Sequence, residues 1–139
     1  MSRKFGSSKI VGSVRTEYTS SYLISLRICE LPGTNACTEK IAYLLDQMTI
    51  CVKDLLTKSN TIINHDVALD FLELNPTGSL LIFRDKKNSL YLFDVKHHER
   101  KTLLDKCEYV QWVPDSDVVV AQDGRRMCIW YNTQAADQV

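Results

Sequence analysis

Three hairpins led by aspartate, repeated at a period of about 40 residues, limit the fold of this chain more than any other feature. The segments "AYLLDQMTICVKDL", "LIFRDKKNSLYLFDV" and "VVAQDGRRMCIWYN" each read as an apolar strand, an Asp-led turn, a second apolar strand and a polar residue. The turn aspartates lie 39 and 38 residues apart: Asp46, Asp85 and Asp123. The closing residues lie 40 and 38 residues apart: Asp54, Asp94 and Asn132. This period predicts three copies of one supersecondary unit.

The central hairpin, from Leu80 to Val95, lacks the alternation of a sheet with one wet face. Its two strands, 80–83 and 90–93, are apolar at successive positions, and successive side chains of a strand point to opposite faces. An antiparallel sheet with one solvated face alternates apolar and polar residues. The sequence therefore predicts that this hairpin is covered on both faces.

Further strand-like segments give each unit four strands. First strands are expected in "SYLISLRI" from Ser21, "VALDFLEL" from Val67 and "EYVQWV" from Glu108, which are rich in β-branched, aromatic and aliphatic residues. The segments "NTIIN" from Asn60 and "KTLL" from Lys101 are shorter and more polar, as is typical of outer edge strands. One more outer strand is expected in "KIVGSV", from Lys9.

A four-stranded antiparallel unit of about 40 residues is typical of a blade of a WD40-type β-propeller. Neighbouring blades would cover both faces of the central hairpin. We expect an all-β chain of about three four-stranded antiparallel blades in an incomplete ring, since seven blades need about 280 residues. The expected units are an N-terminal segment with an outer strand (1–17), two blades (18–63 and 64–105), a partial blade (106–132) and a polar tail (133–139).

Charge and hydropathy argue against several classes of function. Lys plus Arg and Asp plus Glu both number 17, so the basic surface of a nucleic-acid binder is not expected. No apolar run approaches the roughly 20 residues of a membrane helix, and the polar start is unlike a signal peptide, so no membrane insertion is expected. The five cysteines form no C-x-x-C pair, which favours buried reduced thiols over disulfides or zinc. We expect no metal, no cofactor and no small-molecule substrate.

Two groups of residues are candidates for a site. His65, Asp66 and Asp85 supply the residue types of a Ser-His-Asp triad, but the chain has no G-x-S-x-G motif. In WD40 blades a histidine before the first strand commonly joins the turn aspartate and a third-strand tryptophan in a structural network. His65 and Asp85 match those places, and Phe93 replaces the tryptophan, so we favour a structural role over catalysis.

The second group consists of two basic hairpin turns. Their side chains are candidate contacts for a partner with an acidic surface: Arg84, Lys86, Lys87, Arg125 and Arg126. The alternative interpretation is that these are solvated turns.

Five segments, covering about residues 9–132, resemble one known family: "KIVGSVRTEYTSSYLISLRI", "KIAYLLDQMTICVKDL", "LELNPTGSLLIFRDKKNSLYLFDV", "YVQWVPDSDVVVAQ" and "MCIWYN". They are similar to the propeller region of the intraflagellar transport proteins of 172 kilodaltons, large peripheral subunits of complex B. The family carries two amino-terminal WD40 propellers and a long helical arm. The chain departs from it in the loop from Cys29 to Lys40 and in the turn from Asp123 to Arg126.

The resemblance implies a fragment or short form of such a subunit. Its function would be a non-catalytic protein-interaction module in cilium assembly and ciliary cargo transport. Its partners would be other complex B subunits or the remaining blades of its own propeller, at the cilium, the ciliary base and the cytoplasm. Two alternatives stay open: a WD40 adaptor of a non-ciliary complex, and a hydrolase using His65, Asp66 and Asp85.

Overall fold

The computed structural model describes residues 23–30, 37–131 and 133, and within them the chain contains strands and turns but no helix. Eleven strands of the described residues form three antiparallel sheets. The first sheet consists of β1 (Ile24–Glu30), β2 (Cys37–Asp46), β3 (Thr49–Asp54) and β4 (Asn60–Asn64). The middle sheet consists of β5 (Leu69–Leu74), β6 (Leu80–Asp85), β7 (Leu90–Asp94) and β8 (Glu99–Leu104). The last sheet consists of β9 (Tyr109–Trp112), β10 (Val119–Asp123) and β11 (Arg126–Trp130).

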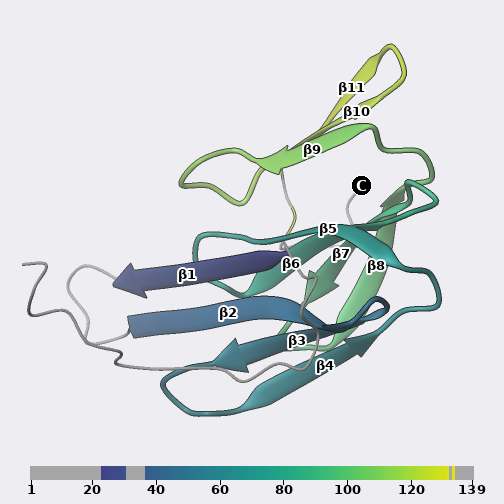
Figure 1. The fold of residues 1–139 in the computed structure, drawn as a ribbon. Coiled ribbons are helices and arrows are strands. Elements are labelled where there is room, and N and C mark those ends of the chain that lie inside the picture. The colour runs from purple at the N-terminus through teal and green to yellow at the C-terminus, as the bar shows by residue number, and fades with distance from the viewer. Residues whose placement is uncertain (1–22, 31–36, 132, 134–139) are drawn as a thin grey trace, which may run out of the picture.

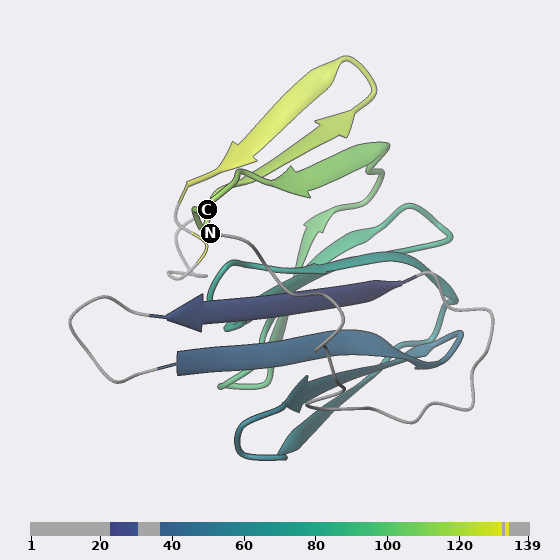
Figure 2. The same cartoon turned by 60° about the vertical axis from the view of Figure 1, so that its left-hand side comes forward.

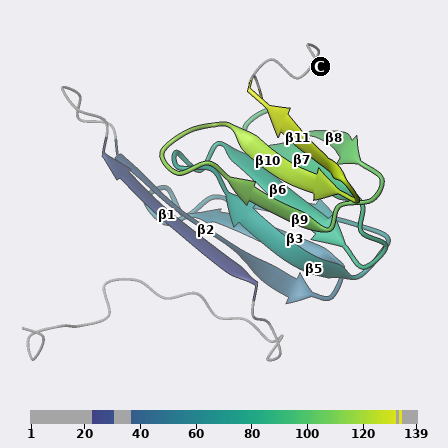
Figure 3. The same ribbon diagram turned by 90° about the horizontal axis from the view of Figure 1, so that it is seen from above.

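The three sheets follow one another as layers, in the order of the chain. Figures 1 and 2 show the middle sheet between the first sheet, in blue, and the last sheet, in green and yellow. From above, the strands of the last sheet lie over those of the middle sheet (Figure 3). The array does not close into a ring. This arrangement confirms the all-β fold class and is consistent with a partial WD40-like propeller.

The three predicted hairpins are confirmed, and the aspartates shape two of their turns. The side-chain Oδ1 of Asp46 accepts a hydrogen bond from the backbone N–H of Met48 at 2.8 Å. Oδ1 of Asp85 accepts one from the N–H of Lys87 at 2.9 Å. A short carboxylate that bonds the backbone two residues on stabilises a tight turn. At Asp123 the following Gly124 has a φ of +58°, a conformation that glycine adopts without a steric penalty.

The middle sheet is buried on both faces, as its lack of alternation predicts. One face of the central hairpin packs in a core with the first sheet, whose contributions include Ala42, Leu44, Ile50 and Val52; the hairpin supplies Leu81, Phe83 and Phe93. The other face packs in a core with the last sheet, which supplies Val110, Trp112, Val119 and Ala121; the hairpin supplies Leu80, Ile82, Leu90 and Leu92. Successive residues of β6 therefore belong to different cores. Each such side chain stabilises the fold by about 1.5 to 3 kcal/mol when fully buried.

Two of the three predicted outer strands lie within the described residues. The segments from Asn60 and Lys101 form outer strands, β4 and the greater part of β8, as predicted. The segment from Lys9 lies outside the described residues, as does Asn132. The residue bounds proposed for the blades and the tail stay a prediction. Nowhere in the described ranges does a helix offer the length and hydropathy needed to cross a membrane.

Candidate functional site

His65 lies in the short link between β4 and β5, where the first sheet passes into the middle sheet. Its backbone N–H donates to the carbonyl of Met48 at 2.9 Å, which ties the link to the turn of the first hairpin. Its side chain is only 2% exposed, and Nε2 lies 2.9 Å from Oδ2 of Asp85. The structure thus brings together the histidine and the turn aspartate that the sequence singles out.

Arg100, on β8, fixes the hydrogen-bonding state of the His65 ring. Its Nη1 lies 3.1 Å from Nδ1 of His65, and its Nη2 donates to the carbonyl of Asn64, on β4, at 2.6 Å. A guanidinium can only donate, so Nδ1 accepts and Nε2–H donates to Asp85. This arrangement is that of a neutral imidazole. Arg100 also joins the outer strands of the first and middle sheets.

Asp85 receives hydrogen bonds from several directions at once. Besides His65, its carboxylate accepts from the N–H groups of Lys87 and Ser89, at 2.9 and 3.2 Å, and from the hydroxyl of Tyr91 at 3.4 Å. Burial raises the pKa of the Asp85 carboxyl, but the hydrogen bonds from His65, Ser89 and Lys87 outweigh burial and hold that pKa below its usual value. Burial also raises the pKa of Tyr91. Asp85 is therefore held as a carboxylate in a nearly closed polar cluster.

Aromatic rings enclose this cluster. The His65 ring meets the rings of Phe83 and Tyr91 edge-on, with centroids 5.4 and 4.8 Å apart, and Phe83 and Tyr91 stack at 5.2 Å. The guanidinium of Arg100 lies 5.6 Å from the centroid of Phe83. Tyr91 lies directly opposite Phe83 in the β6–β7 ladder, and its hydroxyl donates to Asp85, which Phe93, in the place of the expected tryptophan, cannot do. We call these five residues the junction network: His65, Phe83, Asp85, Tyr91 and Arg100.

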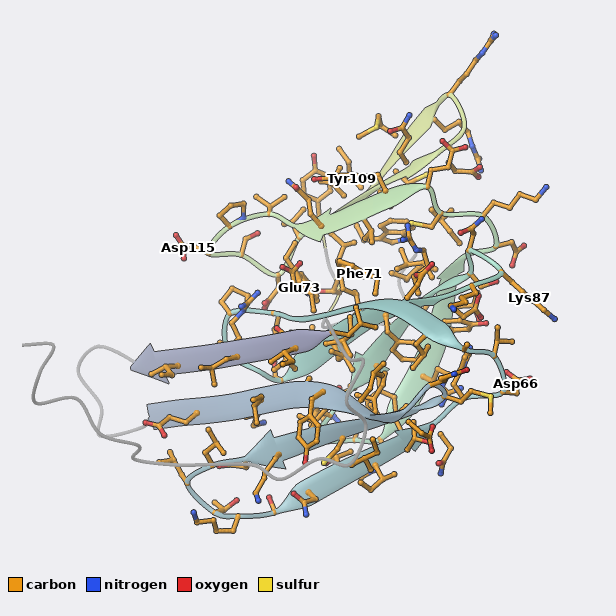
Figure 4. All side chains as sticks on the ribbon, in the orientation of Figure 1. Asp66, Phe71, Glu73, Lys87, Tyr109 and Asp115 are labelled. Carbon is orange, nitrogen blue, oxygen red and sulfur yellow. The ribbon has the colours of Figure 1, made fainter. Side chains whose placement is uncertain are left out.

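Asp66, the third residue of the alternative triad, lies on the surface. Its side chain is 93% exposed, and its Oδ1 is 3.9 Å from Nε2 of His65 (Figure 4). Nε2 and Nδ1 of His65 already face Asp85 and Arg100. In the described ranges, His, Cys, Asp and Glu side chains form no group of three or more that could hold a metal ion.

Arg84, a candidate partner contact, spans the middle and last sheets. Its Nε donates to Oδ1 of Asp70 at 2.9 Å, and its Nη1 donates to the carbonyls of Cys107 and Glu108 at 3.3 and 3.1 Å. The guanidinium also lies 6.0 Å from the centroid of the Phe71 ring. Most of its donor groups therefore bond within the chain, at the entrance to the last sheet.

The other predicted contacts lie at hairpin tips and are exposed: Lys86, Lys87, Arg125 and Arg126. Arg126 forms an ion pair with Asp123, and the hydrogen bond between them raises the pKa of the guanidinium. Figure 4 shows Lys87 projecting from the same rim as Asp66.

A second set of polar links joins the innermost strands. Oγ of Ser25, on β1, accepts from the backbone N–H of Leu74, on β5, at 3.0 Å. Glu73, on β5, repeats this link one sheet further: its Oε1 accepts from the backbone N–H of Trp112, on β9, at 3.4 Å. Its carbonyl also accepts from the Trp112 indole N–H at 3.0 Å, and Arg27 lies 3.4 Å from its Oε2. Glu73 therefore contacts both neighbouring sheets (Figure 4).

Sequence reasoning found two members of the junction network and missed the others. The Asp-led turn identifies Asp85, and the position before a first strand identifies His65. The facing residues of β6 and β7 could have indicated Tyr91, since it lies in the same hairpin as Asp85. Arg100 carried no local signal, because its partners are 35 and 36 residues away.

Comparisons with known proteins find relatives of this chain among the intraflagellar transport proteins. No family model matches the chain. The intraflagellar transport protein 172 homolog of Danio rerio is 46% identical over 138 residues, and intraflagellar transport protein 172 of Chlamydomonas reinhardtii is 43% identical over 139 residues. The homologue in Homo sapiens is also 43% identical over 139 residues. Each match covers 98% of this chain and 8% of the relative. Over nearly its whole length, the chain is therefore homologous to a short segment of intraflagellar transport protein 172.

Proposed function

We propose that the chain is a non-catalytic protein-interaction module of the WD40 propeller type that acts in intraflagellar transport. The observation that carries the proposal is the match to relatives named for this process, in an alga, an insect, a nematode and vertebrates, at 41 to 46% identity. Because the chain spans 8% of the length of those relatives, the proposed function is that of one part of a much larger protein. The expected location is the cilium, with the ciliary base and cytoplasm.

The junction network supports a structural use of His65. A general base needs a ring nitrogen that can reach the proton of a substrate or nucleophile. Both nitrogens of His65 face groups of the chain itself, and the side chain is almost fully buried. This geometry favours a structural role for His65, at the contact between two sheets, over a catalytic role in a hydrolase.

The exposed basic tips are the proposed partner contacts. Arg84 and Arg126 already have carboxylate partners within the chain, so we place the contact chiefly on Lys86, Lys87 and Arg125. Exposed cations on loops steer acidic surfaces toward a rigid scaffold. The proposed partners are acidic surfaces of other complex B subunits, or further blades of the same propeller.

Affinity purification of the tagged chain from ciliated cells tests this function. We expect intraflagellar transport proteins to be recovered, and the tagged chain to be enriched in cilia by fluorescence microscopy. A double variant, Lys86→Glu with Lys87→Glu, should recover less of them. The matched control is Lys58→Glu with Lys96→Glu, two exposed lysines in turns outside the three Asp-led hairpins, which should behave as wild type.

Two results would favour the alternatives. Recovery of a complex without intraflagellar transport proteins would support an adaptor of a non-ciliary complex. Hydrolase activity that disappears in His65→Ala, in a variant that still folds by circular dichroism, would support the enzyme.

A further inference from the structure

The tip of the central hairpin is longer than the tips of the other two Asp-led hairpins. Residues 86–89 lie between β6 and β7, whereas two residues separate β2 from β3 and two separate β10 from β11. The longer tip places the side chain of Ser89 in a loop instead of in a strand. Loops on a rigid scaffold are the segments that other proteins commonly reach.

This tip combines two cations with a serine hydroxyl. Lys86 and Lys87 lie three and two residues before Ser89, and both lysines are exposed (Figure 4 labels Lys87). The first tip, 46–49, contains no lysine or arginine, and the last tip, 123–126, contains no serine or threonine. Many protein kinases select an acceptor serine by cations two and three residues before it, which bind acidic side chains of the kinase. The central tip has this charge pattern.

The Ser89 hydroxyl lies where the tip meets the β8–β9 link, residues 105–108. Its Oγ donates to the carbonyl of Asp105 at 3.4 Å, which is long for a hydrogen bond between two oxygen atoms, and this contact is exposed. The hydroxyl also contacts that of Tyr91, in the junction network. A kinase needs the tip in an extended form, and local opening of an exposed hairpin tip costs less than unfolding of the chain.

The backbone beside this hydroxyl holds the entrance to the last sheet. The carbonyl of Asn88 accepts from the N–H of Cys107, in the β8–β9 link, at 2.7 Å. The N–H of Ser89 donates to Oδ1 of Asp85 at 3.2 Å, and Asp85 is only 1% exposed. A charge added to Ser89 therefore acts on a buried carboxylate and on the link at the same time.

A phosphate on Ser89 opposes these contacts. In the transfer, Oγ bonds to the γ-phosphorus of ATP, the bond from that phosphorus to the ADP oxygen breaks, and the hydroxyl proton passes to the kinase. The ester oxygen then has no proton to donate to the carbonyl of Asp105. The group carries a charge of about −1.5 to −2 at neutral pH beside the Asp85 carboxylate. Pairing with the exposed lysines offsets little of this repulsion, because exposed ion pairs contribute little.

We propose that Ser89 is a phosphorylation site for protein kinases that select basic substrates, and that its phosphate weakens the contact between the central tip and the β8–β9 link. The two cores lie beneath the tip and keep their packing, so the effect is local. This proposal concerns a modification of the chain and does not depend on the role in transport.

Phosphorylation of the complete 139-residue chain tests the site. The purified chain is incubated with magnesium, ATP and the catalytic subunit of the cyclic-AMP-dependent protein kinase, and mass spectrometry locates the phosphate. We expect phosphate on Ser89, and none at this position in Ser89→Ala. Phosphate only on other serines or threonines, or none at all, would overturn the proposal.

A double variant tests recognition through the two cations. Lys86→Ala with Lys87→Ala should lower the initial rate of phosphorylation at Ser89 by about 10-fold, because the acidic groups of the kinase lose their partners. The matched control, Lys58→Ala with Lys96→Ala, removes the same charge from two other exposed turns and should react as wild type. Equal rates for the two double variants would contradict recognition by the tip. Circular dichroism checks that each variant is folded.

Hydrogen exchange of the phosphorylated chain tests the consequence. The amide proton of Cys107 should exchange about 5-fold faster than in the unmodified chain, the change expected when one ordinary hydrogen bond is lost. Amide protons of β6 should exchange at an unchanged rate, since both faces of this strand stay buried. Ser89→Ala removes the hydroxyl without adding charge, so it should change the exchange of Cys107 less than the phosphate does. Unchanged exchange of Cys107 after phosphorylation would overturn the proposed weakening of the link.

Discussion

The middle sheet and the last sheet share one hairpin plan and differ in what covers them. On β6 of the middle sheet, Leu80, Leu81, Ile82 and Phe83 are all buried, because sheets lie on both sides. On the last sheet, Val119 and Ala121 are buried against the middle sheet, while Met127 and Ile129 are exposed on the far face. An apolar strand therefore indicates that its faces are suited to contact with other sheets. Each face is buried only where a neighbouring sheet is present.

The largest contrast between the two sheets should appear in the free energy of unfolding. Phe83→Ala should destabilise the chain by about 3 to 5 kcal/mol, because it leaves a cavity in a core closed on both sides. Ile129→Ala should change stability by about 0.5 kcal/mol or less, as for other surface positions. Urea denaturation of both variants gives the comparison. Similar losses would mean that the far face of the last sheet is covered in solution.

The next contrast concerns the junction network. His65→Ala should cost about 1 to 3 kcal/mol, since Asp85 and Arg100 would each lose a buried hydrogen-bond partner. His97→Ala is the control, because His97 lies in an exposed turn where its ring contacts Asp94 at 2.9 Å. An unchanged denaturant midpoint for His65→Ala would show that the network does not stabilise the fold.

A smaller effect is expected at the contact between the middle and last sheets. Arg84→Met keeps part of the aliphatic chain but removes the bonds to Asp70 and to the carbonyls of Cys107 and Glu108. The loss should be about 1 kcal/mol, because the three hydrogen bonds of this partly exposed side chain are largely exchanged for hydrogen bonds to water. Arg125→Met, at an exposed tip, should leave the thermal midpoint unchanged. If Arg125→Met lowered the thermal midpoint as much as Arg84→Met, the hydrogen bonds of Arg84 between the two sheets would not explain its effect on stability.

The smallest effect is a pH dependence carried by Asp85. The folded pKa of this carboxyl lies below its usual value of 3.8, so it contributes stability that is present above the unfolded pKa and is lost as the pH falls through the folded pKa. Asp85→Asn lacks this contribution, so the difference between the variant and wild type should shrink below about pH 4. Denaturant midpoints between pH 7 and pH 2 measure this. A constant difference would mean that the carboxylate charge has no part in the network.

Local pattern predicted the strands well because each hairpin carries its own signals. The turn aspartates and the apolar runs around them lie within about 15 residues of one another, and the turns of the three hairpins lie where the sequence placed them. The doubly buried hairpin from Leu80 to Val95 also followed from pattern alone, since a strand that is apolar on both faces needs two covers.

Facing direction and distant partners were harder to predict. The last hairpin contains the run Val118, Val119 and Val120, in which Val119 is buried against the middle sheet, while Val120 pairs with Ile129 on the far side. In a run of identical residues the sequence does not show which side chains point to which face of the sheet. Only the pairing of the strands assigns each residue to a face. The polar links of Glu73 and Arg84 escaped for another reason, because their partners lie in neighbouring sheets.

The bonds from Arg84 to the carbonyls of Cys107 and Glu108 also bear on the order in which the chain opens. These bonds hold the segment that leads into β9 against the middle sheet. β11 lies at the opposite edge of the last sheet. Proteins open locally in cooperative units, from their least supported elements inward. Amide protons of β11 should therefore exchange with solvent before those of β9. Local unfolding of the last sheet should begin at β11, while β9 stays in contact with the middle sheet.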